Sequence, residues 1–94
     1  MMKLYHGAVL LGEIGNISQE GSWMYGELVK TPAASQYEDF FAWMTDEEKQ
    51  SEDPPFSDDY LNPDNWSIED ETGKRRGIEV PAVHDDGSIE WRWS

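Results

Sequence analysis

The chain has 94 residues and no cysteine, and its 20 acidic and 7 basic side chains give a formal net charge of −13. A disulfide framework and a thiolate nucleophile are therefore excluded. Aromatic residues make up 13% of the chain and include five Trp, whereas disordered acidic chains are poor in aromatic residues. The composition thus predicts a small acidic protein that folds as a single domain over residues 1–94.

The N-terminal end offers one Lys and a short apolar run at residues 8–11. This run is too short for the apolar core of a signal peptide or for a membrane span. We therefore expect a cytoplasmic protein with no membrane partner.

Residues 4–30 are predicted to form an N-terminal hairpin. Residues 4–17 are apolar and rich in Gly, which predicts one long strand with a bulge near Gly12. Turn residues follow at 19–22, and the alternation in residues 23–30 is typical of a second strand. The side that carries Met24 and Leu28 is expected to face the helix, with Trp23 and Tyr25 on the opposite face.

Residues 32–49 form the one amphipathic helix that the sequence predicts. Thr31 is placed to cap its N-terminus, and Pro32 suits the first helical position because its missing N–H would be unpaired there. Four large apolar side chains recur with the helical period and define the face expected to pack on the sheet: Tyr37, Phe40, Phe41 and Met44.

Residues 50–65 are predicted to be an acidic, Pro-rich loop. Residues 57–61 favour one helical turn, and residues 62–65 carry a turn signature with Pro at the second position. Connections longer than about 12–15 residues are usually functional or disordered, so this loop is the first candidate for a binding segment.

Residues 66–93 are predicted to be a three-stranded meander. Its middle strand spans residues 76–82, with Pro81 at a strand end or on an edge, and Asp86-Gly87 is the expected two-residue turn before the last strand. The resulting fold class is α+β in the order ββα-βββ, an antiparallel sheet of about five strands with the helix packed across a face.

The negative charge is concentrated in one region. Residues 38–71 hold thirteen carboxylates and one Lys, a net of −12, and the remaining residues have a net of −1. Such a block repels nucleic acid and anionic membranes and attracts basic protein surfaces. The only basic cluster, residues 74–76, is expected to pair with the chain's own carboxylates.

No residue pattern compels a particular chemistry. His84 and Asp85 are adjacent in a strand, so they point to opposite faces and would not converge on one ion. His6 is the only other histidine, and two histidines without cysteine make a structural zinc site unexpected. No catalytic residue, cofactor or metal ligand is assigned, and we expect a protein that is not an enzyme.

The main functional hypothesis is an interaction protein whose acidic surface binds a basic protein partner and does not contact nucleic acid directly. Its composition resembles that of bacterial toxin-immunity proteins and phage-encoded DNA mimics, which implies an inhibitor or nucleic-acid-mimic role and a bacterial or phage origin. A monomer is the favoured oligomeric state. The candidate partner-binding residues are Phe56, Asp58, Asp59, Tyr60, Asp64 and Trp66.

The alternative is a small-ligand-binding module, or a minor enzyme, that uses an aromatic-lined face of the sheet. The residues of this alternative surface are Trp23, Tyr25, Glu90 and Arg92. An exposed pocket ringed by Trp and Tyr would favour the ligand-binding hypothesis, and a flat acidic patch would favour the basic partner.

Overall fold

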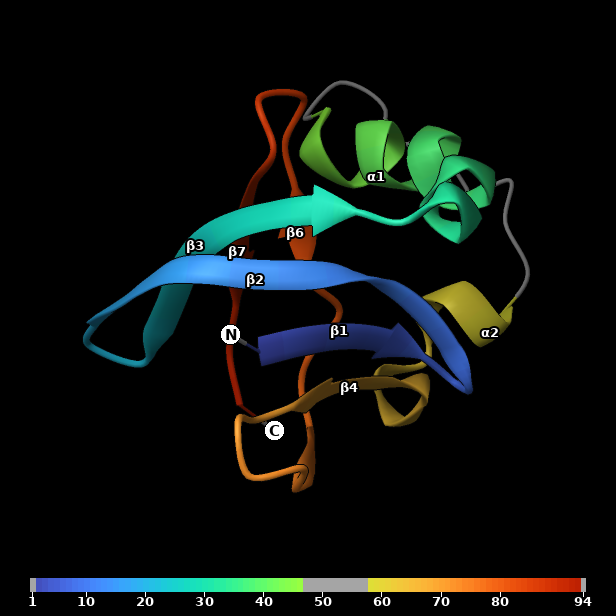
Figure 1. Cartoon of the computed structure of the whole chain (residues 1–94). Helices are drawn as coiled ribbons and strands as arrows, with labels where there is room; N and C mark the ends of the chain where they lie inside the picture. Colours follow the sequence, from blue (N-terminus) through green and yellow to red (C-terminus); the bar gives the residue numbers. More distant parts are fainter. Residues whose placement is uncertain (1, 47–57, 94) are drawn as a thin grey trace.

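Seven antiparallel strands form the sheet of the computed structural model, in the order β5-β4-β1-β2-β3-β7-β6 (Figure 1). The structure describes residues 2–46 and 58–93. The strands are β1 (Met2–His6), β2 (Val9–Glu20), β3 (Trp23–Lys30), β4 (Trp66–Glu69), β5 (Arg75–Gly77), β6 (Ala82–Val83) and β7 (Ser88–Trp91). The helical elements are the 3-10 helix η1 (Pro32–Tyr37), α1 (Glu38–Thr45), the single turn α2 (Asp58–Leu61) and the 3-10 turn η3 (Pro63–Asn65). The α+β class with an antiparallel sheet and one main helix is confirmed.

The prediction of about five strands is wrong because two predicted strands are each split in two. The region 4–17 contains a turn at Gly7, whose φ of 59° suits glycine, and this turn separates β1 from β2. The expected bulge is present, since the register of β1 against β2 shifts opposite Leu11, next to Gly12. The region 76–82 is interrupted before β6, where Pro81 has no N–H to donate to a neighbouring strand.

The segment between β5 and β6 joins the two ends of the sheet. The Ile78 N–H donates to the Trp66 carbonyl at 3.1 Å, and Ile78 also forms an isolated antiparallel bridge with Trp93. The Glu79 N–H then donates to the Arg92 carbonyl at 2.9 Å. Because β5 and β6 are the outermost strands, these contacts curl the sheet toward a closed barrel. In Figure 1 the chain from β5 to β6 runs from the side of β4 to the side of α1.

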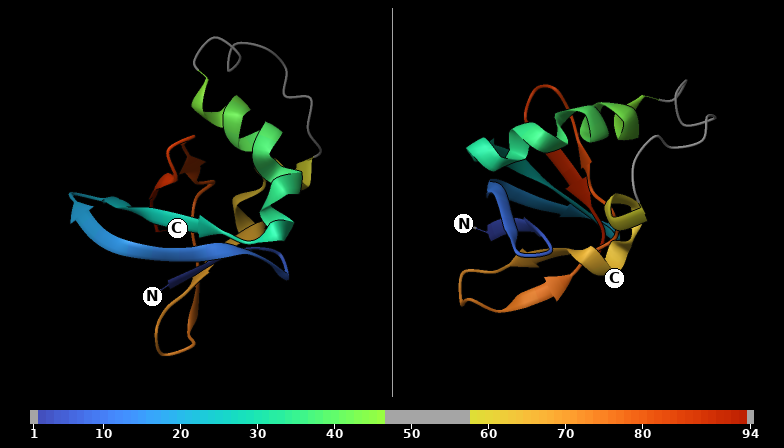
Figure 2. Two further views of the ribbon diagram at one scale, coloured as in Figure 1. Left: turned by 45° about the horizontal axis from the view of Figure 1, so that its top comes forward. Right: turned by 90° about the vertical axis from the view of Figure 1, so that its right-hand side faces the viewer.

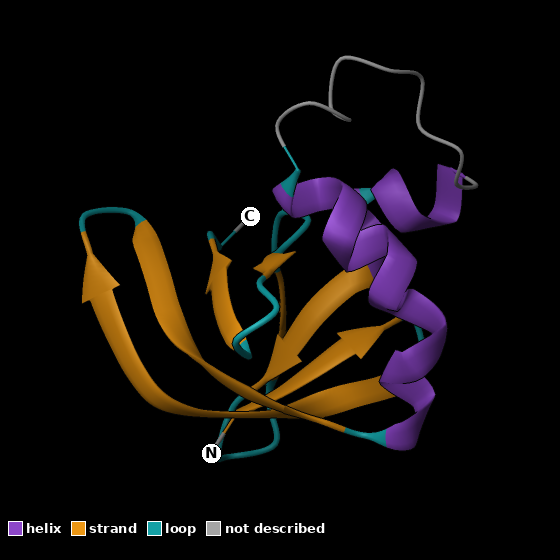
Figure 3. Ribbon diagram, turned by 90° about the horizontal axis from the view of Figure 1, so that it is seen from above, coloured by secondary structure: helices purple, strands orange, loops and turns teal. Residues whose placement is uncertain are grey.

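The core lies inside this curled sheet and is covered by the helical segment. Met24 and Leu28 face inward and Trp23 is exposed, as the alternation in β3 predicted. η1 packs against β2 and α1 against β6, so the helices gather on one side while the β2–β3 hairpin extends away on the other (Figures 2 and 3). The buried core residues are Leu4, Leu11, Ile14, Met24, Leu28, Ala34, Tyr37, Phe40, Phe41, Trp66, Ile68, Ile78, Val83, Ile89 and Trp91.

The helix predicted over residues 32–49 differs from the observed one at both ends. Its first part is the 3-10 helix η1, and after α1 the backbone of Asp46 is extended, while residues 47–49 lie outside the described part of the chain. The Thr31 side chain accepts no hydrogen bond from the helix N-terminus, and its hydroxyl points to β2, where it donates to the Leu10 carbonyl at 2.7 Å. The Thr31 N–H also donates to the Leu11 carbonyl at 2.9 Å. Thr31 therefore attaches the start of the helical segment to β2.

A helix that spans a membrane must be long and predominantly apolar. No helix within residues 2–46 and 58–93 has the length and apolar composition that crossing a bilayer requires.

Phe41 is 2% exposed and its ring lies 6.2 Å from those of Tyr37 and Trp66. We expect Phe41→Ala to lower the free energy of unfolding by about 3–5 kcal/mol, because it removes a buried ring and leaves a cavity. Urea denaturation followed by Trp fluorescence measures this loss. The control is Ala42→Ser, an exposed neighbour on the same helix, which should change stability by less than about 0.5 kcal/mol. A loss below about 1 kcal/mol for Phe41→Ala would contradict the burial of this face.

Candidate functional site

The acidic turn, which we define as residues 58–65 (α2 and η3), is held to the barrel by His6. The His6 Nε2 lies 2.8 Å from the carbonyl oxygen of Asp59 and the Nδ1 lies 2.9 Å from the Tyr37 hydroxyl. Because a carbonyl only accepts, Nε2 carries a proton, and in the neutral ring Nδ1 accepts from Tyr37. Burial, with a smaller contribution from nearby Tyr60, raises the pKa of Tyr37, which keeps its hydroxyl protonated as the donor. The Tyr60 ring stacks on His6 with centroids 5.4 Å apart.

Trp66 supports the acidic turn from the core side and is not available to a partner. It is fully buried, its indole N–H donates to the Tyr60 carbonyl at 2.8 Å, and its ring stacks on Phe40 at 5.9 Å. Its assignment as a partner-binding anchor is corrected here: in the same β4 strand Trp66 is in phase with Ile68, and both side chains face the core.

The other candidate partner-binding residues lie at different depths. Asp59 and Asp64 are exposed on the acidic turn, and Tyr60 is half-buried. Asp64 donates its N–H to the Asn62 side chain at 3.0 Å, which orders the η3 turn. Phe56 lies outside the described residues, and so does the side chain of Asp58.

Several exposed carboxylates have no cationic partner. Glu38 and Asp39 in the first turn of α1, together with Asp59 and Asp64, form no ion pair with any other described residue. All four side chains are exposed to solvent.

The arginines contact the chain's own aromatic rings instead. The guanidinium carbon of Arg75 lies 3.9 Å from the centroid of the Tyr5 ring, and that of Arg76 lies 4.3 Å from the Trp93 ring. These cation–π contacts place the guanidinium groups of Arg75 and Arg76 against the rings of Tyr5 and Trp93.

No ion pair of the basic cluster, residues 74–76, is found among the described residues. Hydrogen bonds from Thr72 and the Lys74 N–H, together with the positive charge of Lys74, lower the pKa of Asp70, so Lys74 interacts with one of the chain's own carboxylates.

The alternative surface is brought together on the outer side of β3 and β7. Tyr25 is the direct cross-strand partner of Glu90, and the guanidinium carbon of Arg92 lies 5.4 Å from the ring centroid of Trp23. Trp23 is 42% exposed. Arg92 also pairs with Glu79, at 3.7 Å between Nε and the carboxylate.

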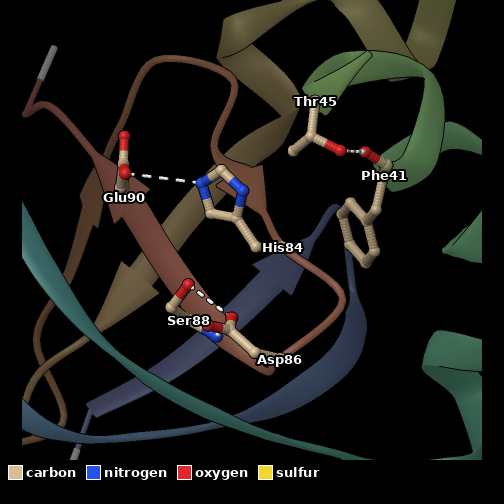
Figure 4. Close-up of polar contacts among 6 residues, drawn as sticks. All are labelled: Phe41, Thr45, His84, Asp86, Ser88 and Glu90. Atoms are coloured by element: carbon tan, nitrogen blue, oxygen red, sulfur yellow. Dashed lines mark hydrogen bonds and ion pairs between the residues drawn. The ribbon is translucent and has the colours of Figure 1, made fainter.

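A cavity of about 330 Å³ opens between α1 and the β6–β7 turn, and we call it the helix–hairpin cleft. Figure 4 shows its surroundings, with His84 lying between Phe41 and Glu90. The cleft was not predicted from the sequence, because its two walls are more than forty positions apart along the chain. The residues that line it are Lys30, Glu38, Asp39, Phe41, Ala42, Val83, His84 and Asp85.

The β6–β7 turn is one residue longer than the predicted Asp86-Gly87 turn. The His84 N–H donates to the Ser88 carbonyl at 2.9 Å and the Gly87 N–H donates to the His84 carbonyl at 3.0 Å, so residues 85–87 form a three-residue loop. Gly87 takes the left-handed position at φ 89°, which fits the second commonest type of hairpin loop. Hydrogen bonds from the Ser88 hydroxyl and N–H lower the pKa of Asp86, so this carboxylate stays ionised beside the cleft.

His84 forms a polar contact across the two strands of this hairpin. Its Nε2 lies 3.3 Å from a carboxylate oxygen of Glu90, and both side chains are 39% exposed. No group of three or more His, Asp or Glu side chains within residues 2–46 and 58–93 is placed to hold a metal ion.

Comparisons with known proteins identify no family for this chain. No protein-family model, curated protein or solved structure matches the chain. The proposed function therefore has to come from the chemistry of the surface.

The attachment of the acidic turn by His6 is open to a direct test. His6→Phe keeps an aromatic ring against Tyr60 but removes the hydrogen bonds to Asp59 and Tyr37, at about 0.5–1.5 kcal/mol each. We expect faster amide hydrogen exchange at Asn65, whose N–H donates to the Asn62 carbonyl, with little change at core amides.

Tyr5→Phe is the matched control, because Tyr5 neighbours His6 in β1 but donates its hydroxyl to Glu69, at the end of β4 away from the acidic turn. This variant should leave the exchange of the acidic turn unchanged. Equal exchange rates at Asn65 in His6→Phe and wild type would show that His6 does not hold the turn.

Proposed function

We propose that this protein is a non-enzymatic interaction protein that binds a basic protein, in the manner of an immunity protein, an inhibitor or a nucleic-acid mimic. The observation that carries the proposal is that the exposed carboxylates of Glu38, Asp39, Asp59 and Asp64 form no ion pair with any residue in 2–46 or 58–93. Arg75 and Arg76 lie over aromatic rings of the chain itself, and within residues 2–46 and 58–93 neither forms an ion pair with these four carboxylates.

The distribution of these carboxylates suits a protein partner with a basic surface. Exposed charges of one sign raise the rate of encounter with an oppositely charged partner and repel DNA, RNA and anionic membranes. A formal net charge of −13 on 94 residues makes this steering strong at low salt. A nucleic-acid mimic would use the same carboxylates in place of phosphates.

The acidic turn is also held in place before any partner arrives. The hydrogen bonds of His6 and Trp66 to the carbonyls of Asp59 and Tyr60 fix its backbone against the core. A surface that is ordered in advance loses less conformational entropy on binding. The carboxylates of Asp59 and Asp64 thus project from a turn whose backbone is anchored to the core.

The alternative surface on β3 and β7 supports a second candidate function, a small-ligand-binding module. Its support is the half-exposed Trp23 ring beside Tyr25, with Glu90 and Arg92 as polar groups on the same face. Arg92 already covers Trp23 and pairs with Glu79, which accounts for these contacts without a ligand. The basic-partner proposal is preferred for this reason.

A salt series on a partner recovered with the protein tests the main proposal. We expect the association rate to fall steeply between about 50 and 500 mM NaCl, because exposed charges are screened over this range. Asp59→Asn combined with Asp64→Asn should weaken binding, chiefly through slower association. Surface plasmon resonance gives both rate constants.

The matched control is Glu13→Gln combined with Glu20→Gln, which removes the same charge from exposed positions of β2. This control should bind nearly as well as wild type at physiological salt. Salt-independent binding, or equal weakening in both double variants, would contradict the proposed acidic surface. Salt-independent binding that is lost in Trp23→Ala would support the second candidate function instead.

A further inference from the structure

The helix–hairpin cleft combines two kinds of wall. One side carries Glu38 and Asp39 from the first turn of α1, and the other carries Asp85 from the β6–β7 turn. The floor is apolar but narrow: Phe41 and Val83 line it with the 2% of their surface that is exposed, and the exposed Ala42 lies beside them. The cleft therefore offers apolar contact at its base and carboxylates on two opposing sides.

The charge balance of the cleft is negative. Three carboxylates line it against the single ammonium group of Lys30. The ionised Asp86 next to Asp85 adds to the negative potential at the hairpin wall. An anionic ligand would be repelled, and a cationic ligand would be attracted.

The size of the cleft fits one long side chain. Its volume of about 330 Å³ is at the lower end of the range of about 300–1,000 Å³ that is typical of ligand pockets. A long basic side chain can lay its methylene stem on an apolar floor and keep its charged end among polar groups. Phe41, Ala42 and Val83 provide such a floor.

A guanidinium group matches the two opposing walls better than an ammonium group does. Its planar fork of five donors can reach carboxylates on two sides at once, whereas an ammonium acts as a point charge. Since Asp39 and Asp85 come from different elements, the ligand must bridge α1 and the hairpin.

We propose that the helix–hairpin cleft binds an arginine side chain inserted by the basic partner, an inference that rests on the proposed function and names the residue that the partner contributes. The arginine stem packs on Ala42 and on the exposed edges of Phe41 and Val83, and its guanidinium lies between the α1 carboxylates and Asp85. Lys30 borders the site and disfavours a second cation.

Three short peptides test this site without the partner. They are acetyl-Gly-Gly-X-Gly-Gly-amide with arginine, lysine or citrulline as X, citrulline being the uncharged isostere of arginine. In a ¹H–¹⁵N NMR titration, we expect saturable shifts of the Ala42, Val83 and Asp85 amides with the arginine peptide. The lysine peptide should bind more weakly, and the citrulline peptide should produce no saturable shift.

A pair of charge-matched variants supplies the control. Asp39→Asn combined with Asp85→Asn should weaken binding of the arginine peptide by about twofold to thirtyfold, the range expected from the loss of two exposed ion pairs. Glu13→Gln combined with Glu20→Gln removes equal charge from β2 and should leave the affinity near that of wild type. Denaturation curves verify that both variants are folded.

Two results would overturn the arginine site. One is equal weakening in the two double variants, and the other is arginine-peptide shifts confined to the acidic turn with none at the cleft. The failures of the two proposals are distinguishable. If the partner binds in a salt-dependent way and its binding depends on Asp59 and Asp64 but not on Asp39 and Asp85, the arginine site in the cleft is overturned and the proposed function is supported.

Discussion

The rest of the structure depends on the two backbone hydrogen bonds that join the ends of the sheet. The Ile78 N–H donates to Trp66 and the Glu79 N–H donates to Arg92, so the chain leaves one edge of the sheet and pairs at the other. Backbone groups at a sheet edge need partners, and this crossing supplies them between the chain's own strands. It also delivers the β6–β7 hairpin to the side where α1 lies.

The functional surfaces follow from this closure. The Leu28 N–H donates to the Gly87 carbonyl at 2.7 Å, which fixes the hairpin turn beside β3. α1 then packs on β6, and the space left between helix and turn is the helix–hairpin cleft. Toward the other edge of the sheet, β4 pairs with β1, and Trp66 and His6 are direct cross-strand partners. Together they hold the acidic turn. One closed sheet thus positions both groups of exposed carboxylates.

Local periodicity was sufficient to predict the inner face of the sheet and of the helix. Met24 and Leu28 face inward because alternate residues of a strand share a face, and Phe40 and Phe41 do so because of the helical period. Trp66 shows the limit of this reasoning. Its strand phase indicated the core and its acidic surroundings suggested a partner, and only the packing against Phe40 decides that it is buried.

The features that were missed arise from contacts between distant parts of the chain. Thr31 has the residue type of a helix cap, but its hydroxyl points to β2 and donates to the Leu10 carbonyl there. The predicted strand over residues 76–82 is divided into β5 and β6 because the two ends of the sheet meet at Ile78. This contact joins distant parts of the chain, so it could not be predicted from the local sequence. The cleft required both the helix face and the closed sheet, so no short-range pattern in the sequence could reveal it.

The most direct test of this account is native-state amide hydrogen exchange at Ile78 and Glu79. If these two hydrogen bonds close the sheet, both amides exchange only through global unfolding, with the same opening free energy as the core amide of Leu28. Exchange of Ile78 and Glu79 at the rate of unprotected amides, while Leu28 stays protected, would mean that the sheet is open. The helix–hairpin cleft would then not exist as described.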